Sequence, residues 1–168
     1  MYTLKSRGLK LLKVLHLITA SCWVGGALSL FFLFFLKGDI DSQEIIHGVN
    51  QSIHHVDFWV IILPGAPGCA LTGLAYSLFT NWGFVKHRWV AVKWVITIIA
   101  ILSGTFFLGP WEKTLLQLSA NGNIDIFNHV PYGETELWHF ILGSLQVAML
   151  LFTVVISVYK PWRKKSSA

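Results

Sequence analysis

Seven histidines and a few charged side chains are the residues of this chain whose types suggest chemistry. Several of them lie inside or beside long apolar segments, where an ionisable side chain is costly to bury and is a functional candidate by default. They fall into two groups along the sequence. The first group contains His54, His55, Asp57, Glu136 and His139, and the second contains His16 and Lys93.

The first group has the spacing of a ligand site. Glu136 and His139 are three residues apart, as are His54 and Asp57, so each pair lies on one face of a helix. Two imidazoles at similar depth on facing helices can ligate a haem, which predicts His139 together with His54 or His55. Mixed imidazole and carboxylate ligands also suit copper or zinc, which predicts a metal site formed by the whole group. Ordinary polarity at a membrane surface is the simpler alternative for each residue alone.

The second group consists of one histidine and one lysine. A neutral imidazole in an apolar environment must find a partner, because an unpaired buried polar group costs about 1–3 kcal/mol. His16 is therefore predicted to ligate an inner haem, and Lys93 to pair with an acidic group of that cofactor, such as a haem propionate. Alternatively, Lys93 extends its ammonium group to the lipid headgroups. As a second haem ligand, His87 matches the depth of His16 in the membrane only loosely.

Four apolar segments must position these residues: 9–36, 53–80, 89–109 and 137–159. Each is long enough to cross a bilayer as a helix, which takes about 20 residues. The chain is 54% hydrophobic and only 12% charged, whereas a soluble domain has about 25% charged residues. We therefore expect an all-α, integral membrane four-helix bundle that forms a single domain over residues 1–168. The net charge of +5 then reflects membrane topology, and no nucleic-acid partner is expected.

The charges are divided between the two sides of the expected bundle. Eleven of the thirteen Lys and Arg residues lie on the side that holds both termini, and all eight Asp and Glu residues lie on the other. Because basic residues concentrate in cytoplasmic loops, both termini are predicted to be cytoplasmic, in the inner membrane of a bacterium. The basic residues on the terminal side are Lys5, Arg7, Lys10, Lys13, Lys86, Arg88, Lys93, Lys160, Arg163, Lys164 and Lys165.

Two short motifs predict how the helices meet. Gly25 and Gly26 in the first segment lack side chains and would let a neighbouring helix approach closely. Residues 64–68 read Pro-Gly-Ala-Pro-Gly in the middle of the second segment, where proline removes backbone hydrogen bonds. We expect there either a simple kink or a wide place in the bundle where a cofactor or substrate enters.

The first segment contains the motif Lys10-x-x-Lys13-x-x-His16, followed by Trp-Val-Gly-Gly at 23–26, and the third contains Trp89-x-x-x-Lys93. These motifs resemble patterns of small bacterial membrane families. These are the CopD-type copper-resistance membrane domain, the HemJ-type protoporphyrinogen oxidase and related four-helix proteins. The resemblance to the HemJ-type family implies that His16 and Lys93 serve haem binding and activity. Residues 31–36 are all apolar, where that family has an aromatic and arginine-rich end, so protoporphyrinogen oxidation is not part of the prediction.

The histidine placement also resembles that of small four-helix b-type cytochromes with two haems. Together these features predict a membrane-embedded b-type haem-binding protein with a redox or electron-transfer role and one or two haems. Its expected partners are the lipid bilayer, a redox partner or quinone, and further copies of the chain in a homo-oligomer. Two alternatives stay open, namely a membrane protein that binds or transports copper or zinc and a non-catalytic membrane subunit. No catalytic residue is assigned.

Overall fold

A computed structural model describes residues 6–80 and 83–161, and its secondary structure is entirely helical. The predicted all-α class is confirmed, and four helices in the described part are long and apolar enough to cross a membrane. Lys5, Arg163, Lys164 and Lys165, which entered the prediction of orientation, lie outside the described residues.

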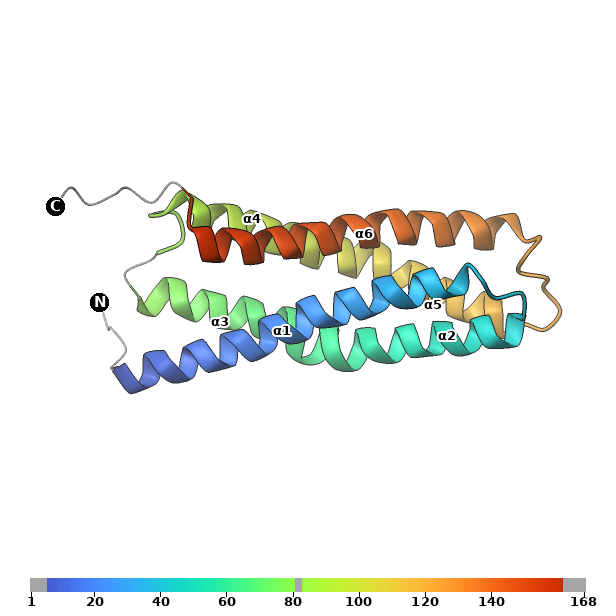
Figure 1. The fold of residues 1–168 in the computed structure, drawn as a ribbon, viewed down its shortest axis with the longest axis horizontal. Helices are drawn as coiled ribbons and strands as arrows, with labels where there is room; N and C mark the ends of the chain where they lie inside the picture. Colours follow the sequence, from blue (N-terminus) through green and yellow to red (C-terminus); the bar gives the residue numbers. More distant parts are fainter. Residues whose placement is uncertain (1–5, 81–82, 162–168) are drawn as a thin grey trace.

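The first and fourth spans are single helices, α1 (Ser6–Lys37) and α6 (Val130–Tyr159). The second span is α2 (Gln43–Val56), a π-helical segment η1 (Asp57–Gly65) and α3 (Ala66–Phe79). The third span is α4 (Arg88–Ser103), a second π-helical segment η2 (Gly104–Leu108) and α5 (Gly109–Ala120). The chain runs without interruption through each of these composite spans (Figure 1).

The helices are longer than the apolar segments that predicted them. The second span begins at Gln43 rather than at residue 53, the third continues to Ala120 rather than ending at residue 109, and α6 begins at Val130 rather than at residue 137. The added turns are amphipathic. For example, α2 buries Ile46, Asn50 and Ile53 on one face. Hydropathy marks the part of a helix that suits lipid, whereas helical hydrogen bonding continues wherever a buried face supports it.

The contacts between the four spans form a closed ring, in which each span packs against two neighbours. The helix α1 packs against η1 and α3 on one side and against α6 on the other. The helix α6 also packs against α4 and α5, and α5 packs against α2. The second span therefore lies diagonally opposite α6, and the third span lies diagonally opposite α1. Residues from two diagonal spans can face the interior from opposite sides.

The predicted close approach at the Gly25–Gly26 pair is confirmed for one of the two residues. A Cβ atom at Gly26 would lie 2.6 Å from Ile61 Cγ1, whereas a Cβ atom at Gly25 would have nothing within 4 Å. A Cβ atom at Gly65 would lie 3.1 Å from the backbone N and Cα atoms of Trp23. Small residues on both sides thus bring α1 and η1 close together at mid-bundle.

The segment around Pro64 is wound as a π-helix rather than broken. A proline ring cannot donate to the carbonyl four residues earlier and clashes with it, and a wider π turn separates these groups. Pro64 lies inside η1, and Pro67 and Pro110 lie in the first turns of α3 and α5, directly after η1 and η2. The two π-helical segments therefore widen the second and third spans at their centres.

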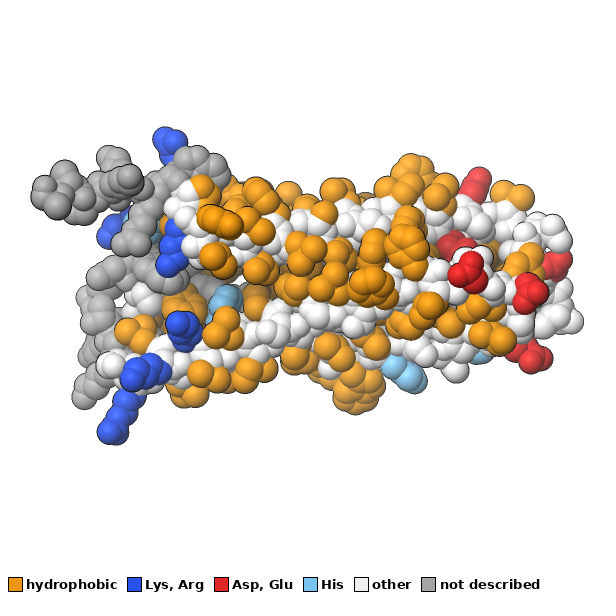
Figure 2. Space-filling model, in the orientation of Figure 1, with side chains coloured by type: hydrophobic (Ala, Val, Ile, Leu, Met, Phe, Trp, Pro, Cys, Tyr) orange, Lys and Arg blue, Asp and Glu red, His pale blue; other side chains and the backbone are white. Residues whose placement is uncertain are grey.

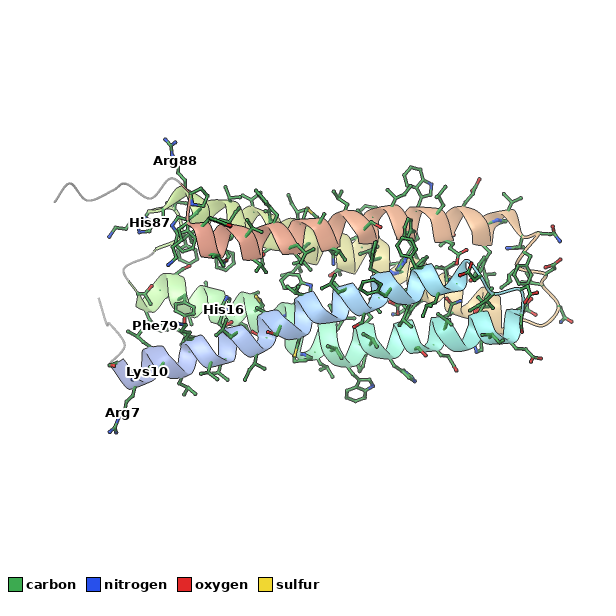
Figure 3. All side chains as sticks on the ribbon, viewed as in Figure 1. Arg7, Lys10, His16, Phe79, His87 and Arg88 are labelled. Carbon is green, nitrogen blue, oxygen red and sulfur yellow. The ribbon has the colours of Figure 1, made fainter. Side chains whose placement is uncertain are left out.

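Charge is distributed along the bundle as the sequence predicts. Figure 2 shows Lys and Arg side chains at one end, Asp and Glu side chains at the other, and a broad apolar surface between them. We call these the basic end and the acidic end. Arg7, Lys10, His87 and Arg88 are labelled at the basic end in Figure 3. The apolar surface includes exposed residues such as Leu11, Phe32 and Leu71, and a water-soluble monomer rarely exposes such an area.

Candidate functional site

The bundle interior contains two cavities, one toward each end. The acidic-end cavity has a volume of about 600 Å³, and its lining includes Phe34, His54, Asp57, Glu112, His139 and Gln146. The basic-end cavity has a volume of about 580 Å³, and its lining includes Lys13, His16, Cys69, Tyr76, Lys93 and Lys160. Both volumes lie within the range of about 300–1,000 Å³ that is common for small-molecule sites. Residues of η1 and η2 line the acidic-end cavity, so the bundle is open beside these segments, and entry of a cofactor or substrate there stays a prediction.

His54 on α2 is held by a carboxyl group from the third span. Its Nδ1 atom lies 2.7 Å from Oε1 of Glu112, which is only 6% exposed. Where the Glu112 carboxylate accepts the Nδ1 proton, the lone pair of a neutral His54 ring is on Nε2. A carboxylate behind an imidazole in this way fixes the ring and makes it a better metal ligand. Asp57 on η1 lines the same cavity beside this pair.

Glu112 is the residue of this site that the sequence argument missed. It falls in residues 110–136, which the sequence predicts to be a connection between the third and fourth helices. The prediction counts it only as one of the acidic residues on the outer side of the membrane. In the structure the stretch begins with α5, which buries Glu112, Leu115 and Ser119. This spacing of three and four residues is the helical signal that could have identified Glu112 as an inward-facing carboxyl group.

His139 on α6 faces the same cavity from the diagonally opposite span. It is 6% exposed, and its ring stacks on Phe34 with 4.9 Å between the ring centroids. Its Nδ1 atom is buried and has no hydrogen-bond partner in the described part of the chain. The bundle therefore brings two imidazoles, His54 and His139, to one predominantly apolar cavity from opposite sides.

His55 and Glu136, the remaining members of the first group of candidate residues, lie apart from His54 and His139 and do not line this cavity. His55 is exposed on α2. Glu136 forms an ion pair with Lys37, which is buried at the end of α1 with its Nζ atom 4.6 Å from the centroid of the Phe34 ring. Within residues 6–80 and 83–161, no three His, Cys, Asp or Glu side chains are grouped closely enough to hold a metal ion by themselves.

His16 on α1 faces the basic-end cavity, and Figure 3 shows it between α1 and α3. Its Nδ1 atom lies 2.8 Å from Oγ1 of Thr72, and that hydroxyl group donates to the carbonyl of Gly68 at 2.6 Å. Since the single hydroxyl proton is used in this way, the Thr72 oxygen accepts from Nδ1–H of His16. The lone pair of a neutral His16 ring is then on Nε2, the atom that a metal needs. No pattern in the sequence identifies Thr72 as a partner of His16.

Lys93 on α4 lines the basic-end cavity from the span diagonally opposite His16. Lys13 and Lys160 line it as well, whereas none of the eight Asp and Glu residues does. Nζ of Lys93 lies 6.0 Å from the centroid of the Trp89 ring, at the outer limit of a cation–π contact. His87 directly precedes α4 at the basic end, and His16 is the one histidine of the described residues that lines this cavity.

The acidic-end cavity thus provides two imidazoles and two carboxyl groups, and the basic-end cavity provides one imidazole and three amines. Both can hold a planar apolar cofactor, and the basic-end cavity can in addition neutralise acidic substituents. No family model, no curated protein and no solved structure matches this chain. The arrangement of these side chains is therefore what the functional argument rests on.

Proposed function

We propose that this protein is a membrane-embedded b-type haem protein with a redox or electron-transfer role. Four apolar spans and the apolar surface between two charged ends support insertion into a bilayer. The basic residues at the end that carries both termini support a cytoplasmic location for that end, in the inner membrane of a bacterium.

The observation that carries the proposal is the pair of histidines at the acidic-end cavity. His54 and His139 would hold the iron of a haem from two diagonal spans, because a haem binds protein through imidazole ligands. Glu112 would orient His54 through its Nδ1 atom. The apolar lining excludes water, and Phe34 holds the His139 ring by stacking. Haem itself supplies the reversible one-electron chemistry.

The basic-end cavity is the proposed site of a second haem. His16, whose ring contacts Thr72, would hold the iron of this haem, and no second histidine of the described residues lines the cavity. Lys93 pairs with a propionate group, since an ammonium group in an apolar cavity needs an anion to offset its desolvation. A quinone or another membrane redox partner would exchange electrons with the bound haem.

A spectrum of the purified protein tests this proposal against its alternatives. The protein is extracted in detergent, and its absorbance is recorded in the oxidised state and after reduction with dithionite, together with its copper, zinc and iron contents. A sharp Soret band and haem iron support the proposal. A colourless protein with stoichiometric copper or zinc would instead support the copper- or zinc-binding alternative, and a colourless metal-free protein would support a non-catalytic membrane subunit.

A further inference from the structure

The helices α1 and α6 separate in the half of the bundle that leads to the basic end. Toward the acidic end they pack together, and Trp23 of α1 shares an apolar cluster with Leu150 of α6. Toward the basic end α1 packs against α3 instead, where His16 Nδ1 lies 2.8 Å from Thr72 Oγ1. Figure 1 shows α1 and α6 diverging in this half. The basic-end cavity lies where they diverge, since residues of α1, α3, α4 and α6 line it.

The exposed residues that line this cavity belong to α1 and α6 alone. Leu17 on α1 is 55% exposed, and Val154 and Val158 on α6 are 46% and 73% exposed. The lining residues of α3 and α4, such as Ser77 and Trp89, are buried or half-buried. A side chain that lines a cavity and is also exposed lies at its rim. The cavity therefore opens sideways between α1 and α6, and we call the gap between Leu17, Val154 and Val158 the lateral opening.

Basic side chains flank the lateral opening on the side of the basic end. Lys13 precedes His16 by three residues and so lies about one turn nearer to that end, and Lys160 directly follows α6. Both line the cavity, as does Lys93 from α4, and no Asp or Glu residue does. Figure 2 shows the Lys and Arg side chains gathered at this end of the bundle. These charges attract an anionic group and disfavour a zwitterionic one, whose ammonium group would be repelled.

The apolar rim and the basic flank together match the two parts of an anionic lipid. An acyl chain can lie against Leu17, Val154 and Val158, which suit the hydrocarbon of a bilayer. Lysine side chains can extend their ammonium groups to the level of the lipid headgroups. Basic pockets between membrane helices bind anionic headgroups in this way. A free phosphate ion would gain nothing from the apolar rim, so the rim favours a lipid over a free anion.

We propose that the lateral opening binds one anionic phospholipid from the leaflet at the basic end. Its phosphate group pairs with Lys13 and Lys160, and one acyl chain lies between α1 and α6 against Leu17 and Val158. The lipid closes the open side of the cavity and leaves the interior around His16 available to a cofactor. This inference goes beyond the proposed function, because it requires no haem in either cavity.

The test is lipid binding to the detergent-purified protein, measured by native mass spectrometry. Dioleoyl phosphatidylglycerol, which is anionic, is compared with dioleoyl phosphatidylcholine, which is zwitterionic, and inorganic phosphate is added as a competitor in a separate series. Lys13→Gln removes one flanking charge, and its matched control Lys10→Gln removes the same charge from an exposed residue of α1 outside the cavity lining. Leu17→Trp fills the opening, and Leu11→Trp places the same bulk at an exposed position away from it.

We expect the wild type to bind one phosphatidylglycerol about tenfold more tightly than phosphatidylcholine. Lys13→Gln should weaken this binding about fivefold, the effect of one lysine near an anionic headgroup. Leu17→Trp should weaken it several-fold, and both control variants should bind the lipid like the wild type.

Four results would overturn the inference. They are equal affinity for the two lipids, an effect of Lys13→Gln no larger than that of Lys10→Gln, wild-type binding in Leu17→Trp, and displacement of the lipid by phosphate, which would indicate a site for free anions. Haem content is measured on the same samples without added lipid. A haem-free protein that binds phosphatidylglycerol as expected would contradict the proposed function alone, and a haem-loaded protein without lipid selectivity would contradict this inference alone.

Discussion

The Nδ1 atom of His54 and the Oε1 atom of Glu112 are 2.7 Å apart, and they join the second and third spans inside the acidic-end cavity. With the Glu112 carboxylate as the acceptor, this hydrogen bond sets the tautomer of the imidazole and leaves the lone pair on Nε2, the arrangement that a metal-binding histidine needs.

Replacing Glu112 tests whether this hydrogen bond supports cofactor binding. We expect Glu112→Leu to weaken haem binding at the acidic-end cavity by about 10–100-fold, because an unoriented imidazole is a poorer ligand. Glu112→Gln retains an acceptor oxygen and should lose much less. Haem retention during dilution, measured by the Soret band, checks both variants. Equal retention in Glu112→Leu and the wild type would show that Glu112 has no part in ligation.

Thr72 is expected to act in the same way on His16. Thr72→Val removes the acceptor for Nδ1–H while it keeps the shape of the side chain, so we expect haem at the basic-end cavity to bind about tenfold more weakly. Thr72→Ser keeps the hydroxyl group and is the matched control. Titration with haem, followed by absorbance, measures the affinity. A loss in Thr72→Ser as large as that in Thr72→Val would point to packing rather than to the hydrogen bond.

The sequence predicted the four spans because long apolar segments suit a bilayer, but it did not predict their ends. Glu112 was missed because α5 is amphipathic and lies beyond the apolar segment of its span. His54 and His55 could not be distinguished, since neighbouring residues on a helix point about 100° apart and only packing decides which one faces inward. Glu136 was grouped with His139, but its carboxylate pairs with Lys37, a contact that depends on how α1 ends beside α6.

Two glycines give opposite expectations for stability. In Gly65→Ala the new methyl group would meet the carbonyl oxygen of Val60 and the backbone of Trp23, none of which can rotate away, so we expect a destabilisation of about 1–3 kcal/mol. Gly25→Ala meets no atom within 4 Å and should leave stability unchanged or raise it by up to about 1 kcal/mol, because alanine favours a helix. Thermal unfolding of both variants in the same detergent is the measurement. Equal unfolding temperatures for Gly65→Ala and the wild type would refute the close approach of α1 and η1.

The orientation of the bundle is tested with reporter fusions. The separation of basic from acidic residues predicts cytoplasmic termini, so a reporter that is active only in the cytoplasm should work when it is fused after Ala168. A reporter that is active only in the periplasm should be silent there and active when inserted near Gly122, between α5 and α6. The reverse pattern would place the acidic end in the cytoplasm.

The number of haems per chain in His139→Ala, with His55→Ala as the control, tests the central claim most directly. His139 faces the acidic-end cavity, whereas His55 is exposed on α2. We predict that His139→Ala inserts into the membrane at normal levels and loses the haem of the acidic-end cavity, and that His55→Ala keeps the wild-type haem content and spectrum. Wild-type haem content and an unchanged reduced-minus-oxidised spectrum in His139→Ala would contradict ligation at this cavity.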